Sequence, residues 1–190
     1  IVTYVARTLV PYRGFHIFMR ALVQLQREHP TCHVVIVGGD EVSYGSPPKN
    51  AANWREKMLS EVKLDMSRVH ILGKLPYATY AKVLQVSAAH VYLTYPFVLS
   101  WSMLEAMASA CVMIASRTAP VEEVITDGVQ GVLTDFFDSE QLVKHVVHAL
   151  NHPESYRAMR AAARAKVQAD YTLDKAEKSF KGLILGDAKP

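Results

Sequence analysis

The chain has 190 residues, of which 50% are hydrophobic and 21% charged, and its formal net charge is +3. This composition is typical of one globular domain with a full core, and it excludes a densely basic nucleic-acid-binding protein. No apolar run approaches the roughly 20 residues that cross a bilayer, so we expect no integral membrane segment.

The opening sequence IVTYVAR already has strand character. We therefore expect no signal peptide, and we expect the chain to be a piece of a longer protein. Cys32 and Cys111 each lie at or beside an apolar strand and are predicted to be buried free thiols. Free thiols suit a reducing compartment, so the predicted location is the cytoplasm.

Short apolar segments rich in valine and isoleucine alternate with helical patterns along the chain. We predict strands over residues 2–6, 33–37, 69–72, 89–94, 112–115 and 131–134. Helices are predicted over residues 14–28, 53–64, 78–85, 100–110, 138–150, 153–168 and 173–184, and a short turn or helix over residues 120–125.

Strands that are apolar on both faces are typical of a buried parallel sheet. The alternation predicts an α/β fold: a Rossmann-like, doubly wound parallel sheet of about six strands with helices on both faces, followed by C-terminal helices. Ligands of such sheets bind outside the carboxyl ends of the strands. The long loop over residues 38–52 lies on that side, and its role stays open.

Candidate ligand-binding residues follow the first two strands. Arg7 and Arg13 are separated by six positions between the first strand and its helix, and guanidinium groups suit phosphate oxygens. They are equally well explained as two solvated arginines beside a turn. Gly38 and Gly39 follow the second strand, where they permit either close approach of a ligand or a plain turn.

The stretch from Thr94 to Ala108 is a strand-to-helix connection with one carboxylate, Glu105, in the helix. Unpaired N–H groups and the positive end of a helix dipole suit a phosphate, and a carboxylate one turn further suits sugar hydroxyls. Ser102 and Glu105 also fit a capping box, which would give Glu105 a purely structural role. The segment 95–97 is either a rigid turn or a stacking wall.

Several motifs are missing from the sequence: G-x-G-x-x-G, the P-loop, G-x-S-x-G, H-E-x-x-H and D-x-D. Their absence argues against a nicotinamide dehydrogenase, an NTPase, a hydrolase triad and a metal-clamped diphosphate. We therefore expect no metal site. In the turn before the last strand, Glu123 can reach a ligand, whereas Glu122 is better explained as solvated.

Taken in order, these pieces resemble the C-terminal, donor-binding domain of a GT-B-fold glycosyltransferase of the group 1 (family 4) retaining type. The resemblance covers nearly the whole chain. It is carried by Ala6–Gly14, by Gly38 and Gly39, by Val69–Pro76, by the LEAMA block at Leu104–Ala108, by Val112–Ser116 and by Glu123–Gly131.

The resemblance implies roles for individual residues. Arg7 and Arg13 would bind the donor diphosphate, with Arg13 standing where the family usually has lysine. Glu105 matches the second glutamate of the family's E-x7-E motif, which holds the donor ribose. Phe97 replaces the first glutamate, which touches the donor sugar in the family, and this replacement implies a different sugar contact or altered activity.

The implied donor site includes Gly38, Gly39, Gly73, Leu75, Phe97, Leu99, Ser100, Trp101, Ser102 and Glu105. The implied reaction is hexosyltransferase-type: metal-independent transfer of a sugar from a UDP- or GDP-linked donor to an acceptor hydroxyl, with retention and with no other cofactor.

The implied partner is an N-terminal acceptor-binding domain of the same polypeptide, against which residues 171–184 would pack. We expect this chain alone to be inactive, and we expect any membrane contact to be peripheral and to come through the full-length enzyme. The alternatives are a non-catalytic nucleotide-sugar-binding domain and another GT-B-fold enzyme such as a sugar epimerase.

Overall fold

The computed structural model describes residues 1–185, which form a parallel sheet of six strands in the order β3-β2-β1-β4-β5-β6. This is the doubly wound, Rossmann-like arrangement expected from the sequence. The strands are β1 (Val2–Thr8), β2 (Val34–Gly39), β3 (Val69–Ile71), β4 (Ala89–Tyr92), β5 (Met113–Ser116) and β6 (Val132–Thr134).

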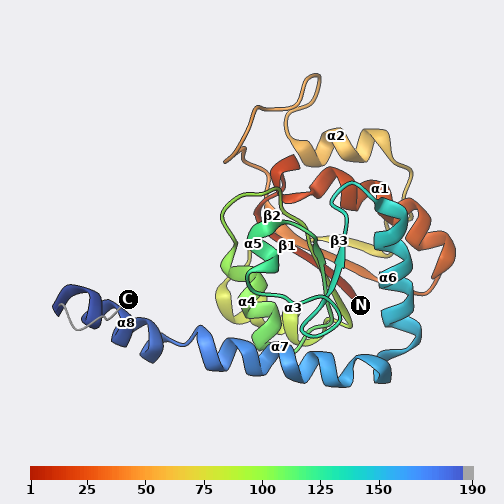
Figure 1. Cartoon of the computed structure of the whole chain (residues 1–190). Helices are drawn as coiled ribbons and strands as arrows, with labels where there is room; N and C mark the ends of the chain where they lie inside the picture. Colours follow the sequence, from red (N-terminus) through yellow and green to blue (C-terminus); the bar gives the residue numbers. More distant parts are fainter. Residues whose placement is uncertain (186–190) are drawn as a thin grey trace.

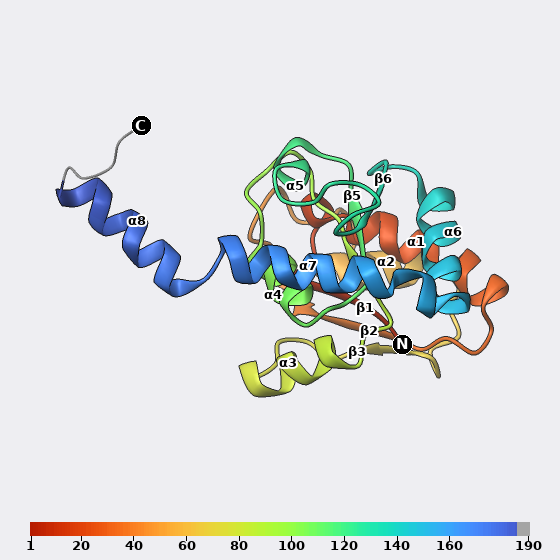
Figure 2. The same ribbon diagram turned by 60° about the horizontal axis from the view of Figure 1, so that its bottom comes forward.

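Helices cover both faces of the sheet (Figures 1 and 2). One face carries α1 (Phe15–Glu28), α2 (Trp54–Glu61) and α6 (Ser139–Asn151), and the other carries α3 (Tyr77–Gln85), α4 (Trp101–Ala108) and α7 (Arg157–Asp170). The remaining helical segments are the short helix α5 (Ala119–Glu122), the 3-10 turns η1 (Pro11–Arg13) and η2 (Pro153–Tyr156), and α8 (Leu173–Leu185).

The sheet has a hydrophobic core on each side. Tyr4 of β1 stacks on Phe18 of α1, with ring centres 4.7 Å apart, and lies in the core that β1 shares with α1 and α6. Met103 and Met107 of α4 lie fully buried in the second core. Burying a side chain of this size stabilises the fold by about 1.5–3 kcal/mol, and both faces of the strands contribute. This two-sided burial explains why the strand sequences are continuously apolar.

Several predicted boundaries differ from the observed ones, by two residues at the ends of β1, β2 and β4 and by three at the ends of α2 and α5. At β2 the difference concerns two candidate site residues. The strand continues through Gly38 and Gly39, so these glycines do not form the plain turn considered from the sequence. A Cβ atom on Gly38 would lie 2.6 Å from the carbonyl oxygen of Ala6 in the neighbouring strand. The first glycine is therefore required by the packing of β1 against β2. Cys32 and Cys111 are buried free thiols, as predicted.

Helix α8 projects away from the sheet and its covering helices in both ribbon views, at the blue end of the chain. Its large apolar side chains are exposed, among them Leu173, Phe180, Leu183 and Ile184. None of the helices among residues 1–185 is both long and apolar enough to cross a membrane.

Candidate functional site

Arg13 is held at the carboxyl edge of the sheet, between β1 and β4. Gly14 adopts a φ of +70°, which turns the chain from η1 into α1 and buries the Arg13 side chain. Its Nη1 donates to the Oγ1 of Thr94 and to the carbonyl oxygen of Val98, each at 2.9 Å. Arg13 therefore holds the connection between β4 and α4 in place through these two hydrogen bonds.

Two aromatic rings complete the surroundings of Arg13. Its guanidinium carbon lies 5.5 Å from the ring centre of Phe97 and 5.8 Å from that of Tyr44. The two rings meet edge to face, with centres 4.9 Å apart. Both distances are within the range of cation–π attraction, and Arg13 forms no ion pair with a carboxylate among residues 1–185. Within the segment 95–97, the ring of Phe97 thus packs on Arg13 and Tyr44 of the same chain.

Arg7 occupies a different environment, although it also lies near the end of β1. Its side chain is exposed, whereas that of Arg13 is buried. A hydrogen bond from Lys74 chiefly lowers the pKa of Glu41, and the charge of Arg7 lowers it further. Arg7 thus lies near an exposed ion pair at the ends of β2 and β3, and the structure does not join it to Arg13 through a shared contact.

The start of α4 has fewer free backbone donors than the sequence predicts. The N–H of Ser100 donates to the hydroxyl of Tyr92 at 2.8 Å, and the N–H of Ser102 donates to the Oγ of Ser100 at 3.4 Å. Within residues 1–185, this leaves the N–H groups of Leu99 and Trp101 without a protein partner in the stretch 99–102. These two donors are the ones available to a ligand.

A pocket opens beside this helix start. It has a volume of about 240 Å³ and is lined by Leu99, Ser100, Trp101, Leu104 and Tyr171. Trp101 is 79% exposed, so its indole is available for stacking. Three of the residues predicted for the site therefore line one pocket.

Glu105 lies inside α4, and the N-cap of that helix is Ser100 rather than Ser102. The capping-box interpretation of Glu105 is therefore wrong. The half-buried carboxylate instead accepts a hydrogen bond of 2.7 Å from the hydroxyl of Tyr80 on α3. Burial and this bond raise the pKa of Tyr80 above its ordinary value, so the phenol stays protonated and donates.

Two further predicted residues lie on the segment between β3 and α3. Gly73 follows β3 with a φ of +67° and open space around it, and its carbonyl oxygen accepts from the N–H of Gly38 at 3.0 Å. Leu75 is half-buried and packs on the same core as Tyr80 and Leu99. The glycine is needed for the left-handed turn that brings the segment toward α3.

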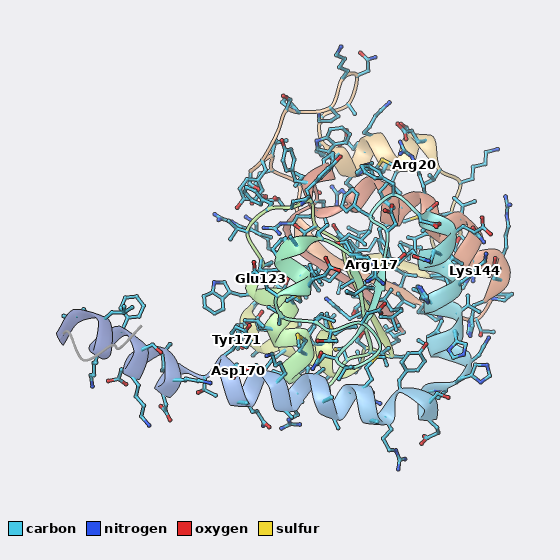
Figure 3. All side chains as sticks on the ribbon, viewed as in Figure 1. Arg20, Arg117, Glu123, Lys144, Asp170 and Tyr171 are labelled. Carbon is cyan, nitrogen blue, oxygen red and sulfur yellow. The ribbon has the colours of Figure 1, made fainter. Side chains whose placement is uncertain are left out.

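The structure also places residues that the sequence indicates more weakly. Glu123 is exposed at the end of α5, and Arg117 pairs with Glu122 and Asp127 near the surface (Figure 3). Among residues 1–185, no group of three or more His, Cys, Asp or Glu side chains is arranged to hold a metal ion. Tyr44 and Tyr80 were not predicted as site residues, because their contacts join segments far apart in the sequence.

The family profile described as "Glycosyl transferases group 1" matches residues 1–166. Searching curated proteins gave no significant match.

Solved structures show the same fold. HepE of Anabaena, crystallised with UDP-glucose, is 18% identical with a TM-score of 0.82 over 97% of this chain and 48% of its own. Sucrose-phosphate synthase of Thermosynechococcus elongatus is 18% identical with a TM-score of 0.78 over 97% of this chain and 46% of its own. The C-terminal domain of LpcC, a group 1 family protein of Francisella tularensis, is 17% identical with a TM-score of 0.76 over 90% of this chain and 86% of its own. The chain thus spans about half the length of the first two relatives.

Proposed function

Because the chain belongs to the group 1 glycosyl transferases, we propose that it is the donor-binding domain of a retaining enzyme that uses a nucleoside diphosphate sugar. The observation that carries the proposal is the placement of Arg13 and Glu105. Arg13 is held beside the connection between β4 and α4, and Glu105 lies in α4 itself. One connection thus presents a cation for a diphosphate and a carboxylate for hydroxyls.

We assign roles from these contacts. Arg13 and the N–H groups of Leu99 and Trp101 face the diphosphate, where fixed positive charge stabilises the leaving group as the glycosidic bond breaks. Glu105, oriented by the Tyr80 hydroxyl, accepts hydrogen bonds from the ribose hydroxyls. Arg7 lies further out and adds long-range attraction for the anion.

We propose a UDP- or GDP-linked hexose as donor and transfer to an acceptor hydroxyl without a metal or another cofactor. The complex of HepE with UDP-glucose supports a nucleotide-sugar donor for this chain. Retention and metal independence rest on the resemblance to the family.

We propose that the whole enzyme has a second, acceptor-binding domain. This chain covers 48% of HepE and 46% of sucrose-phosphate synthase, which supports a second part of similar size. The exposed apolar side chains of α8, Leu173, Phe180, Leu183 and Ile184, are a suitable contact for that domain. On this proposal the chain alone binds donor and catalyses no transfer.

The test is calorimetric titration of the chain with UDP, GDP and ADP in the presence of EDTA, repeated with Mg²⁺. We expect binding of UDP or GDP in both conditions and its loss in Arg13→Met. Arg20→Met is the matched control, because Arg20 is an exposed arginine on α1 that pairs with Glu61 (Figure 3). Failure of every nucleotide to bind, or equal loss in both variants, would contradict the proposal.

The replacement of a family glutamate by Phe97 favours a second candidate, a nucleotide-sugar-binding domain without transferase activity. The two are separated by assaying the full-length protein for transfer, with the anomeric configuration of any product read by NMR. Binding without transfer supports the second candidate, and a product with inverted configuration contradicts retention.

A further inference from the structure

Two tyrosines and two prolines line a second pocket at the carboxyl edge of the sheet. It has a volume of about 450 Å³ and is lined by Pro11, Tyr12, Tyr95 and Pro96. Pro11 and Tyr12 follow β1, and Tyr95 and Pro96 follow β4. These two strands are the point where the strand order reverses, which is where doubly wound sheets bind ligands.

The walls of this pocket are fixed by contacts within the chain. The N–H of Tyr95 donates to the carbonyl oxygen of Tyr12 at 3.0 Å, and the two rings lie 5.7 Å apart at 51°. Tyr95 also packs against Phe136, with ring centres 4.6 Å apart. Even so, Tyr12 and Tyr95 remain 41% and 36% exposed. The pocket is therefore preformed and its rings are accessible.

Tyr12 is also a wall of a neighbouring pocket of about 280 Å³, formed with the long loop between β2 and α2. That pocket is lined by Pro11, Tyr12, Tyr44, Gly45, Ser46, Pro47 and Trp54. Trp54 is tied to the loop, since its Nε1 donates to the carbonyl oxygen of Ser46 at 3.2 Å. The two pockets share Pro11 and Tyr12, and the ring of Phe97 lies 6.2 Å from that of Tyr12.

We propose that the pocket of Pro11, Tyr12, Tyr95 and Pro96 binds a pyranose ring. The C–H groups on one face of a pyranose pack on tyrosine and proline side chains, while its hydroxyls stay in water or reach the phenol oxygens. The pocket lies on the side of β1 and β4 that leads into α1 and α6, whereas Glu105 and Tyr80 lie between α3 and α4. A nucleoside bound at Glu105 leaves it free.

This inference rests on the proposed function, because a sugar-transferring enzyme brings saccharides to this edge. Two sources have the same chemistry: the sugar of the donor and a sugar of the acceptor. The isolated chain is suitable for the test, since it contains the whole sheet and a core on each face. A structure of the C-terminal domain of LpcC by itself is also known.

The experiment is saturation-transfer NMR on the chain with methyl α-D-glucopyranoside. We expect transfer to the ring C–H protons and at least a threefold loss of signal in Tyr12→Leu and in Tyr95→Leu, which remove the flat rings and keep apolar bulk. The control is Tyr77→Leu, which changes a 70% exposed tyrosine on α3, on the other face of the sheet. The backbone amide spectrum of each ¹⁵N-labelled variant reports whether it is folded.

Additions of nucleotide distinguish the two sources of sugar. If UDP-glucose displaces the glycoside and UDP does not, the pocket is assigned to the donor sugar. If the glycoside stays bound in the presence of either nucleotide, the pocket is assigned to the acceptor. Absence of saturation transfer, or equal signals in all variants, would overturn the proposal. UDP binding in the same samples tests the donor site separately, so the two proposals can fail independently.

Discussion

The guanidinium carbon of Arg13 lies 5.5 Å from the ring centre of Phe97. Phe97 is part of the connection between β4 and α4, and the carbonyl oxygen of Val98 in that connection accepts a hydrogen bond from the same arginine. Phe97 stands where the sequence resemblance places a glutamate. A carboxylate here would neutralise part of the arginine's charge, whereas a phenyl ring orients the guanidinium and leaves its charge available to a diphosphate.

Phe97→Ala should therefore weaken UDP binding through Arg13. Loss of a cation–π contact of about 0.5–1 kcal/mol predicts roughly a twofold to fivefold rise in Kd. Val98→Ala is the control, because its side chain is 70% exposed and the variant keeps the carbonyl that Arg13 contacts. Calorimetry measures both variants, and an unchanged Kd in Phe97→Ala would show that the ring does not orient Arg13.

Glu105→Gln should weaken binding of the nucleotide through the ribose. Losing hydrogen bonds to a charged acceptor costs about 1.5–3 kcal/mol, which predicts a rise in Kd of roughly ten- to a hundredfold for UDP. Tyr80→Phe removes only the hydroxyl that orients the carboxylate and should have a smaller effect.

A ribose analogue makes this assignment specific. UDP that lacks both ribose hydroxyls should bind wild type and Glu105→Gln alike, because the interaction lost in the variant is already missing. Tyr77→Phe is the control for Tyr80→Phe, because both tyrosines lie on α3. If Glu105→Gln weakened both ligands equally, the carboxylate would not be the partner of the ribose.

The fold was predictable from the sequence, and parts of the site were not. Alternation of two-sided apolar strands with helices predicts the parallel sheet, because each strand is buried on both faces. The orientation of Glu105 was missed, because its partner Tyr80 lies 25 positions away on another helix. The ring of Tyr44 near Arg13 was also missed, because Tyr44 comes from a loop without periodicity.

Substitution of Gly38 tests the packing of β1 against β2. In Gly38→Ala the new Cβ would lie 2.6 Å from the Ala6 carbonyl oxygen, and this overpacking predicts a loss of about 1–3 kcal/mol in the free energy of unfolding. Gly39→Ala is the matched control, because its Cβ meets the movable side chains of Glu41 and Lys74. Urea unfolding measures both, and equal destabilisation would contradict the packing argument.

His90 should make stability depend on pH. Burial lowers the pKa of this fully buried imidazole to about 4, whereas it is about 6.5 in the unfolded chain. The unfolded state therefore binds the extra proton, and stability present above pH 6.5 falls by about 3 kcal/mol as the pH drops toward 4.

Comparison with His90→Leu isolates this contribution from that of the carboxylates, which titrate in both proteins. Thr3, the partner of His90, also forms a 2.6 Å hydrogen bond with Ser87 that does not involve His90. Urea unfolding between pH 7 and pH 4 should show a shallower loss of stability in His90→Leu. Parallel curves would show that His90 is not the group responsible.

The most direct test of the central claim is a map of backbone amide shifts on adding UDP to the ¹⁵N-labelled chain. The account predicts that the largest changes occur at residues 12–14 and 97–105, around Arg13 and the start of α4, and that they are lost in Arg13→Met. Changes confined instead to the surface pocket between η2 and α7, lined by Arg157 and Arg160, would contradict the assignment of the donor site.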